Sequence, residues 1–171
     1  MTRWSTTGKT LFTLLLIVLV GFGCRASQGV APALADADPT IEREVRAFLD
    51  RWTAAFASRN PAAVRGVLLD DRQFIWLEDG KERYPSVDSI VTALASFPPG
   101  LELNYELHDV QVATLGSGMV WARMKTRTRI RQGEVVVSNF AGVVSMVIAR
   151  QAEGWRIVTA HTSNATTRSA G

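Results

Sequence analysis

The sequence predicts an α+β fold, in which three N-terminal helices pack on one face of a curved, mainly antiparallel sheet. Helical spacing of apolar residues dominates from Pro39 to Phe97, and four long β-rich segments follow as far as Ser163. Helices that precede a run of antiparallel strands generally cover one face of the sheet. With 171 residues, 47% of them hydrophobic, the chain is long enough for one domain with a substantial core.

Each helix has a recognisable beginning. Asp38-Pro39 and Asn60-Pro61 each supply a capping side chain followed by a proline for the first turn, and Ser86 supplies a third cap. We expect the second helix to end at Asp70-Asp71-Arg72 and the third at Pro98-Pro99-Gly100. In the first helix, apolar side chains recur every three or four residues and predict one buried face: Ile41, Val45, Phe48, Leu49, Trp52 and Phe56.

A short hairpin is expected before the third helix. Its strands are predicted at Phe74–Leu77 and Lys81–Tyr84, around a two-residue Asp-Gly turn. This register sets Trp76 opposite Arg83, which predicts a cation–π pair across the strands.

Glycine-containing turns separate the four long strands that follow. The apolar positions change parity at His108-Asp109, which predicts a β-bulge. Val143–Arg150 is apolar at both parities, so we expect a central strand that is covered on both faces. In the last strand, simple alternation places Trp155 and His161 on the same face.

The last hairpin carries a glycine turn, the sequence W-R-I-V at Trp155–Val158, and a strand that ends in H-T-S at His161–Ser163. It resembles the last hairpin of nuclear transport factor 2-like domains, including the SnoaL-like and ketosteroid-isomerase-like groups. The element order from residue 39 to residue 165 is similar to theirs as well. The resemblance implies a cone-shaped, cystatin-like roll with a cavity at its wide end, and it places His161 near the cavity mouth.

His161 is the candidate catalytic residue. An imidazole at the cavity mouth would serve as an acid, a base or a hydrogen-bonding anchor, and the alternative is a structural histidine bonded to a neighbouring strand. The candidate ligand-binding residues are aromatic or polar side chains that either line the cavity or belong to the core or a turn: Trp52, Trp76, Tyr84, Tyr105, Asn139 and His161.

Glu78 lies in a segment, W-L-E-D-G, that resembles the one holding the aspartate base of ketosteroid isomerases. The competing interpretation is a solvated acid paired with Lys81 beside the turn. The tyrosine that these isomerases carry on the first helix falls near Trp52, which offers an N–H donor but no phenol.

The N-terminal segment predicts export. Residues 1–23 have basic residues and then an apolar stretch of about 12 residues, too short to span a bilayer and typical of a signal peptide. Gly23-Cys24 resembles the end of a bacterial lipobox, which implies lipidation at Cys24 and a membrane anchor. The alternatives are cleavage after Ala33-Leu34-Ala35 and an uncleaved anchor, and all three place the domain outside the cytoplasm. Residues 24–38 are predicted to be a linker, and residues 166–171 a polar tail.

Charge and composition narrow the range of partners. Without residues 1–23 the net charge falls from +3 to +1, because that segment holds two basic residues and no acid, so overall charge gives no support for nucleic-acid binding. One cysteine and two distant histidines give no zinc-site spacing, and we expect no cofactor. Five cations share one parity of a single strand, and we expect pairing with Glu102, Glu106 and Glu134, contact with an anionic surface, or an anionic ligand. The five are Arg123, Lys125, Arg127, Arg129 and Arg131.

Three functions are consistent with this sequence. The first is an exported, lipid-anchored and non-enzymatic domain that binds a small apolar or amphipathic molecule. The second is an isomerase, cyclase or dehydratase that uses His161, and the third is an envelope module that forms a homodimer through its sheet face. Fold alone does not distinguish them, because this fold hosts all three.

Overall fold

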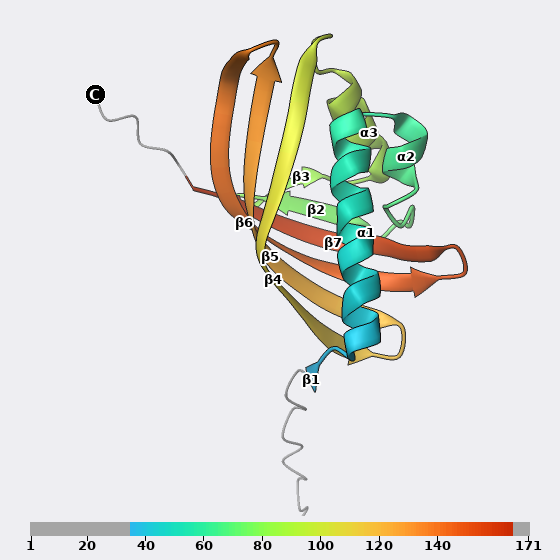
Figure 1. The fold of residues 1–171 in the computed structure, drawn as a ribbon. Coiled ribbons are helices and arrows are strands. Elements are labelled where there is room, and N and C mark those ends of the chain that lie inside the picture. Colours follow the sequence, from blue (N-terminus) through green and yellow to red (C-terminus); the bar gives the residue numbers. More distant parts are fainter. Residues whose placement is uncertain (1–34, 166–171) are drawn as a thin grey trace, which may run out of the picture. The chain divides into compact units, whose positions relative to one another are not determined.

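The computed structural model describes residues 35–165 (Figure 1). The predicted signal peptide, Cys24 and residues 25–34 of the linker precede this range, and the predicted tail at 166–171 follows it. Those predictions lie outside the described residues, and the domain limits of 39 and 165 stay a prediction.

Three helices form where the capping residues predicted them. Helix α1 spans Pro39–Ser58, α2 spans Pro61–Arg65 and α3 spans Val87–Ala95. The side chains of Asp38, Asn60 and Ser86 each accept a backbone N–H from the first turn that follows, which satisfies donors that lack an intrahelical partner.

Seven strands form one sheet in the order β1-β4-β5-β6-β7-β2-β3. The strands are β1 Ala35–Asp36, β2 Ile75–Glu78, β3 Lys81–Tyr84, β4 Leu101–Gly116, β5 Met119–Gln132, β6 Val135–Gln151 and β7 Gly154–Asn164. All neighbours are antiparallel except β2 and β7, which are parallel. Figure 1 shows the long strands curving around α1, and the β2–β3 hairpin extends the sheet beside β7. The predicted α+β fold is confirmed, and both β1 and the parallel pairing are additions to it.

Helix α2 ends earlier than predicted. It stops at Arg65 rather than at Asp70-Asp71-Arg72, and its last hydrogen bond runs from the N–H of Gly66 to the carbonyl of Ala62 at 2.9 Å. The chain beyond it stays buried and pairs with β7, where the N–H of Ile157 donates to the carbonyl of Val67 at 2.9 Å.

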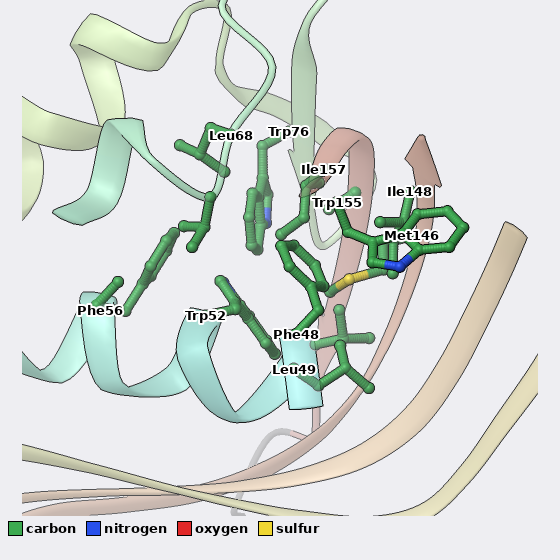
Figure 2. Packing of buried hydrophobic residues seen from close by; sticks show 14 of the residues in the cluster. Phe48, Leu49, Trp52, Phe56, Leu68, Trp76, Met146, Ile148, Trp155 and Ile157 are labelled. Carbon is green, nitrogen blue, oxygen red and sulfur yellow. The ribbon is translucent and has the colours of Figure 1, made fainter. Parts of the chain in front are cut away.

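The core lies between α1 and the concave face of the sheet. The predicted apolar face of α1 is buried from Val45 to Phe56 and packs against Met146, Ile148 and Ile157 of the sheet (Figure 2). Burial of one large apolar side chain stabilises a fold by roughly 1.5–3 kcal/mol, so this contact holds α1 firmly on the sheet.

The β2–β3 register differs from the prediction. Glu78 lies opposite Lys81 as expected, but Trp76 lies opposite Tyr84 instead of Arg83. The cause is an irregularity between Trp76 and Leu77, which adds one residue to the β3 side of the hairpin. The predicted cation–π pair between Trp76 and Arg83 is therefore wrong.

Two β-bulges determine which side chains face inward. The predicted bulge in β4 is confirmed by a register shift after His108 and by the left-handed backbone of Asp109, with φ at 52°. A second bulge, in β7, was not predicted. Ile148 of β6 lies opposite Ile157 whereas Val147 lies opposite Thr159, so Val158 is the extra residue. Before Val158 the odd-numbered residues of β7 face inward, and after it the even-numbered residues do.

Strand β6 lies in the middle of the sheet, as predicted, but it is covered on one face only. Val144, Met146 and Ile148 are buried against the helices, whereas Val143 on the opposite face is 39% exposed. We call this second side, which also carries Trp121 and Arg123, the outer face. Within residues 35–165 nothing covers the outer face at Val143, so that part of the prediction is wrong for the single chain.

Candidate ligand-binding cavity

A cavity of about 190 Å³ lies inside the curve of the sheet, beneath the β2–β3 hairpin and α3. Its wall is mostly apolar and strongly aromatic, with side chains from α1, β2, β3, the end of α3, β4 and β6: Trp52, Phe56, Trp76, Tyr84, Phe97, Tyr105 and Phe140. Its polar side chains are fewer: Glu78, Thr126, Thr128, Thr162 and Asn164. A largely apolar pocket with a few polar groups is typical of small-molecule sites.

The aromatic rings are centred on Trp52, because its i+4 neighbour and two strands bring rings against it. Its ring centroid lies 5.7 Å from that of Phe56, 6.2 Å from that of Trp76 and 6.4 Å from that of Tyr105. These separations are typical of favourable aromatic pairs. Figure 2 shows Trp52 and Phe56 on α1 turned toward Trp76 on β2.

The indole N–H of Trp52 is buried and has no hydrogen-bond partner among the described residues. Leaving such a donor unsatisfied costs about 1–3 kcal/mol, and most buried polar groups in folded proteins find a partner. Trp76 shows the usual arrangement, since its indole N–H donates to the hydroxyl of Thr162 at 3.0 Å. One residue of the cavity wall therefore carries a buried N–H donor that no described residue satisfies.

Tyr105 contributes a phenol that stays protonated. Burial in the cavity wall, reinforced by the nearby Tyr84, raises the pKa of Tyr105 to about 12. The Tyr105 hydroxyl is therefore a neutral group at every physiological pH.

Glu78 supplies the carboxylate of the cavity wall. The side-chain amide of Asn164 donates to one oxygen of Glu78 at 3.1 Å, and the Nε of Arg83 lies 3.6 Å from the other. The backbone N–H of Asn164 is itself held by Asp79 at 2.8 Å, at the turn that follows β2. The carboxylate is thus fixed by the end of β7, and its ion-pair partner is Arg83 rather than the expected Lys81.

Four of the six predicted ligand-binding residues line the cavity, namely Trp52, Trp76, Tyr84 and Tyr105. His161 and Asn139 do not. His161 is exposed on the outer face, because the bulge at Val158 reverses the parity of β7 and turns Ala160, Thr162 and Asn164 inward in its place. Asn139 is exposed on the outer face too, one position before the lining residue Phe140.

Sequence reasoning did not single out Thr162 and Asn164, because the shift in parity that brings them into the cavity depends on the bulge in β7. It did single out Glu78, through the resemblance of its segment to an isomerase motif. The sequence therefore did indicate Glu78 as a candidate site residue, although a surface pairing with Lys81 explained the presence of this acid equally well.

The five cations of β5 lie on the outer face or at its edge, as their parity predicted. Arg129 pairs with Glu106 at 2.7 Å and Arg131 with Glu134 at 3.2 Å, whereas Lys125 pairs with Asp109 at 2.7 Å. Glu102, the third expected acid, forms no ion pair within residues 35–165.

The described part of the chain contains no cluster of three or more His, Cys, Asp or Glu side chains that could hold a metal ion. Within the same residues, no helix is both long enough and apolar enough to cross a bilayer.

Comparison with solved structures finds the same fold in several bacterial proteins. A nuclear transport factor 2-like superfamily protein from Salmonella enterica matches with a TM-score of 0.60 and 17% identity, over 79% of this chain and 99% of that one. A ketosteroid isomerase-like protein from Erwinia carotovora atroseptica matches with a TM-score of 0.55 and 17% identity, over 72% and 95% of the two chains. The beta subunit of benzoate 1,2-dioxygenase from Burkholderia mallei matches with a TM-score of 0.58 and 14% identity, over 72% and 89%.

At these identities the likeness establishes the fold alone. No curated protein matches the sequence significantly. The family model of the SnoaL-like domain, in contrast, matches residues 45–167, which include every residue that lines the cavity. This match covers more than half of the chain and confirms the resemblance first noted in its last hairpin. The chain therefore belongs to the SnoaL-like domain family, and it shares the fold of the nuclear transport factor 2-like protein.

Proposed function

We propose that this protein binds a small apolar or amphipathic molecule in the aromatic cavity. The observation that carries the proposal is the buried, unpartnered indole N–H of Trp52 in the wall of that cavity. The N–H is closed to solvent in the free protein, so a ligand oxygen would reach it after a small movement of the cavity wall. Accepting it would remove a cost of about 1–3 kcal/mol, while the ligand's apolar surface leaves water against the surrounding rings. The volume of about 190 Å³ exceeds the roughly 150 Å³ of an apolar cavity that admits benzene.

The test is an NMR titration of the purified full-length protein with a neutral amphipathic probe, 3,3-dimethylbutan-1-ol. We expect a saturable shift of the Trp52 indole N–H resonance, which the Trp52→Phe variant identifies by its disappearance. Ala93→Leu should abolish the shift, because Ala93 lines the cavity and the added atoms fill it. Ala95→Leu, at an exposed position of the same helix, is the matched control and should leave the shift intact. Absence of a saturable shift with this probe, with an aromatic alcohol and with a charged molecule of similar size would rule out the binding function.

A second candidate function is proton transfer by Glu78, and its place in the cavity wall favours it. A fixed carboxylate beside a small-molecule site is able to take a proton from a carbon next to a carbonyl, and the Trp52 N–H would stabilise the oxygen that becomes negative. The role expected of His161 is not retained, because His161 lies on the outer face.

Deuterium exchange at the α-carbon of small ketones in D₂O, followed by NMR, tests this second function. We expect Glu78→Gln to abolish exchange above the buffer rate and Glu82→Gln, at an exposed position on β3, to leave it unchanged. Exchange at the buffer rate with the native protein would leave binding as the function.

Export and a lipid anchor belong to the same proposal. They are supported by the basic and apolar residues of 1–23 and by the lipobox-like Gly23-Cys24. Mass spectrometry of the protein isolated from host membranes should find a lipidated N-terminal Cys24, and Cys24→Ala should move the protein to the soluble fraction. A mature N-terminus at Asp36 would instead support cleavage after Ala35.

A homodimer through the outer face is the last part of the proposal. Its support is Val143, 39% exposed in the middle of the sheet, together with Arg127 beside it, which has no ion-pair partner within residues 35–165. A two-fold contact would cover Val143 and bring Arg127 near acidic side chains of the other copy. Sedimentation analysis should find a dimer that Val143→Glu converts to a monomer, whereas a monomeric native chain would contradict this part alone.

A further inference from the structure

We infer that the ligand of the aromatic cavity is an organic cation, an amine or quaternary ammonium that also carries an oxygen acceptor. This inference rests on the proposed binding function and adds the charge and chemical class of the molecule bound. It follows from the charge of the wall, the nature of its rings and the position of Arg83.

The charge of the wall selects the sign of the ligand. Among the residues that line the cavity, Glu78 carries a carboxylate and none is lysine, arginine or histidine. A carboxylate or phosphate on the ligand would lose its hydration without gaining an opposite charge, which is strongly unfavourable. An ammonium group would instead lie near the Glu78 carboxylate, in an environment that screens the attraction less than water does.

The rings of the wall are suited to a cation. The faces of tryptophan and tyrosine carry negative electrostatic potential, and such rings around a pocket are the usual means of recognising quaternary ammonium groups. Trp52, Trp76, Tyr84 and Tyr105 all line this cavity. Burial raises the pKa of Tyr105 to about 12, so at physiological pH its ring keeps the neutral, face-accepting form.

Arg83 shows that the wall already attracts a cation at its edge. Its guanidinium carbon lies 5.7 Å from the ring centroid of Tyr84, and its Nε lies 3.6 Å from the Glu78 carboxylate. Arg83 itself does not line the cavity, and its side chain is mostly exposed. The ion pair between Arg83 and Glu78 is long and exposed, so it contributes little free energy. The Glu78 carboxylate therefore remains able to attract a cation bound in the cavity.

The oxygen acceptor follows from Trp52. A cation alone would leave the buried indole N–H unsatisfied, whereas a hydroxyl or carbonyl elsewhere on the same molecule would accept it. The volume of about 190 Å³ suits a compact molecule of this kind. The class is therefore small alkyl- or arylammonium compounds that bear an alcohol, ester or ketone.

Choline and 3,3-dimethylbutan-1-ol are the matched probes for this inference. The two have nearly the same shape and hydroxyl group, but choline has a charged nitrogen where the alcohol has a carbon. We expect the full-length protein to bind choline about tenfold more tightly, as measured by the Trp52 indole N–H shift and by calorimetry. Glu78→Gln should lower the affinity for choline far more than the affinity for the alcohol, and so remove most of that preference.

Two further variants on β3 sharpen the test. Glu82→Gln removes an exposed carboxylate on the same hairpin and should keep the preference for choline. Arg83→Gln removes the competing cation and should raise the affinity for choline without altering that for the alcohol. Far-ultraviolet circular dichroism of each variant confirms that the fold is retained.

The failures of the two proposals are distinguishable. If the alcohol binds as tightly as choline or more tightly, or if Glu78→Gln leaves the ratio unchanged, the cation inference is overturned and the binding function stands. If neither probe produces a saturable shift, and benzyl alcohol produces none either, both are overturned. If benzyl alcohol binds and choline does not, the cation inference alone is overturned.

Discussion

The indole N–H of Trp155 on β7 donates to the carboxylate of Glu44 on α1 at 3.2 Å. The guanidinium of Arg150 completes the contact, since its carbon lies 4.5 Å over the Trp155 ring and it pairs with the same carboxylate. One acid on α1 thus fastens the helix to the β6–β7 hairpin through a hydrogen bond and an ion pair.

We predict that Glu44→Ala lowers the free energy of unfolding by about 1–2 kcal/mol, because it removes charge-assisted hydrogen bonds at a half-exposed site. Glu42→Ala, which removes an exposed pair with Arg46 one turn apart on the same helix, should cost at most about 0.5 kcal/mol. Urea denaturation of both variants measures the difference. Equal losses would show that the Trp155 contact adds nothing.

A second prediction concerns Gly142, where β6 meets the end of β7. A Cβ added there would lie 2.6 Å from the carbonyl oxygen of Ser163, a clash with backbone that has little freedom to move. Gly142→Ala should therefore destabilise the protein by about 1–3 kcal/mol and loosen the strand that holds Asn164. Thermal unfolding measures the loss, and Ala141→Ser, at the exposed neighbouring position, should leave the midpoint unchanged.

A third prediction is a loss of stability at high pH that depends on Tyr105. Its pKa is about 12 in the folded protein and about 10.0 in the unfolded chain, so between these values the folded state holds a proton that the unfolded state has released. The stabilising contribution is complete below pH 10 and is lost as the pH rises through 12, by roughly 3 kcal/mol in all, since each pKa unit is worth about 1.4 kcal/mol. Urea denaturation from pH 8 to pH 11.5 should show the decline, and Tyr105→Phe should reduce its slope. An identical slope in Tyr105→Phe would contradict the assignment.

A fourth prediction concerns Asp109 on the outer face. Its hydrogen bond to Lys125 and the charge of that lysine lower the pKa of the Asp109 carboxyl. Lys125→Ala should return this pKa toward its ordinary value of 3.8, as measured by NMR titration of the carboxyl carbon. Arg131→Ala, which breaks a pair with Glu134 on the same strand, should leave the Asp109 titration in place.

The sequence predicted the helices and the aromatic wall well, because their signals are local. Capping residues such as Asp38 act within one turn, and the spacing of Val45 to Phe56 describes one face of one helix. Trp52, Trp76, Tyr84 and Tyr105, which the sequence offered as either cavity or core residues, all line the cavity in the structure.

The polar part of the site could not be predicted in the same way. The inward position of Thr162 and Asn164 depends on one extra residue in β7, at Val158, and alternation in the sequence gives no sign of it. His161 lies on the outer face for the same reason. The contact of Asn164 with Glu78 joins residues 86 positions apart, through a parallel pairing that only tertiary structure establishes.

That parallel pairing has a consequence for the order in which the ribosome makes the protein. The β2–β3 hairpin is synthesised early, yet β2 has no neighbour other than β3 until β7, about 80 residues later, has been made. Contacts so distant along the chain form slowly in general. A nascent chain that has not yet reached Trp155 holds the rings of the site without the strand that anchors Glu78. The capacity to take up a ligand should consequently arise at once, near the end of translation, and not grow as the chain lengthens.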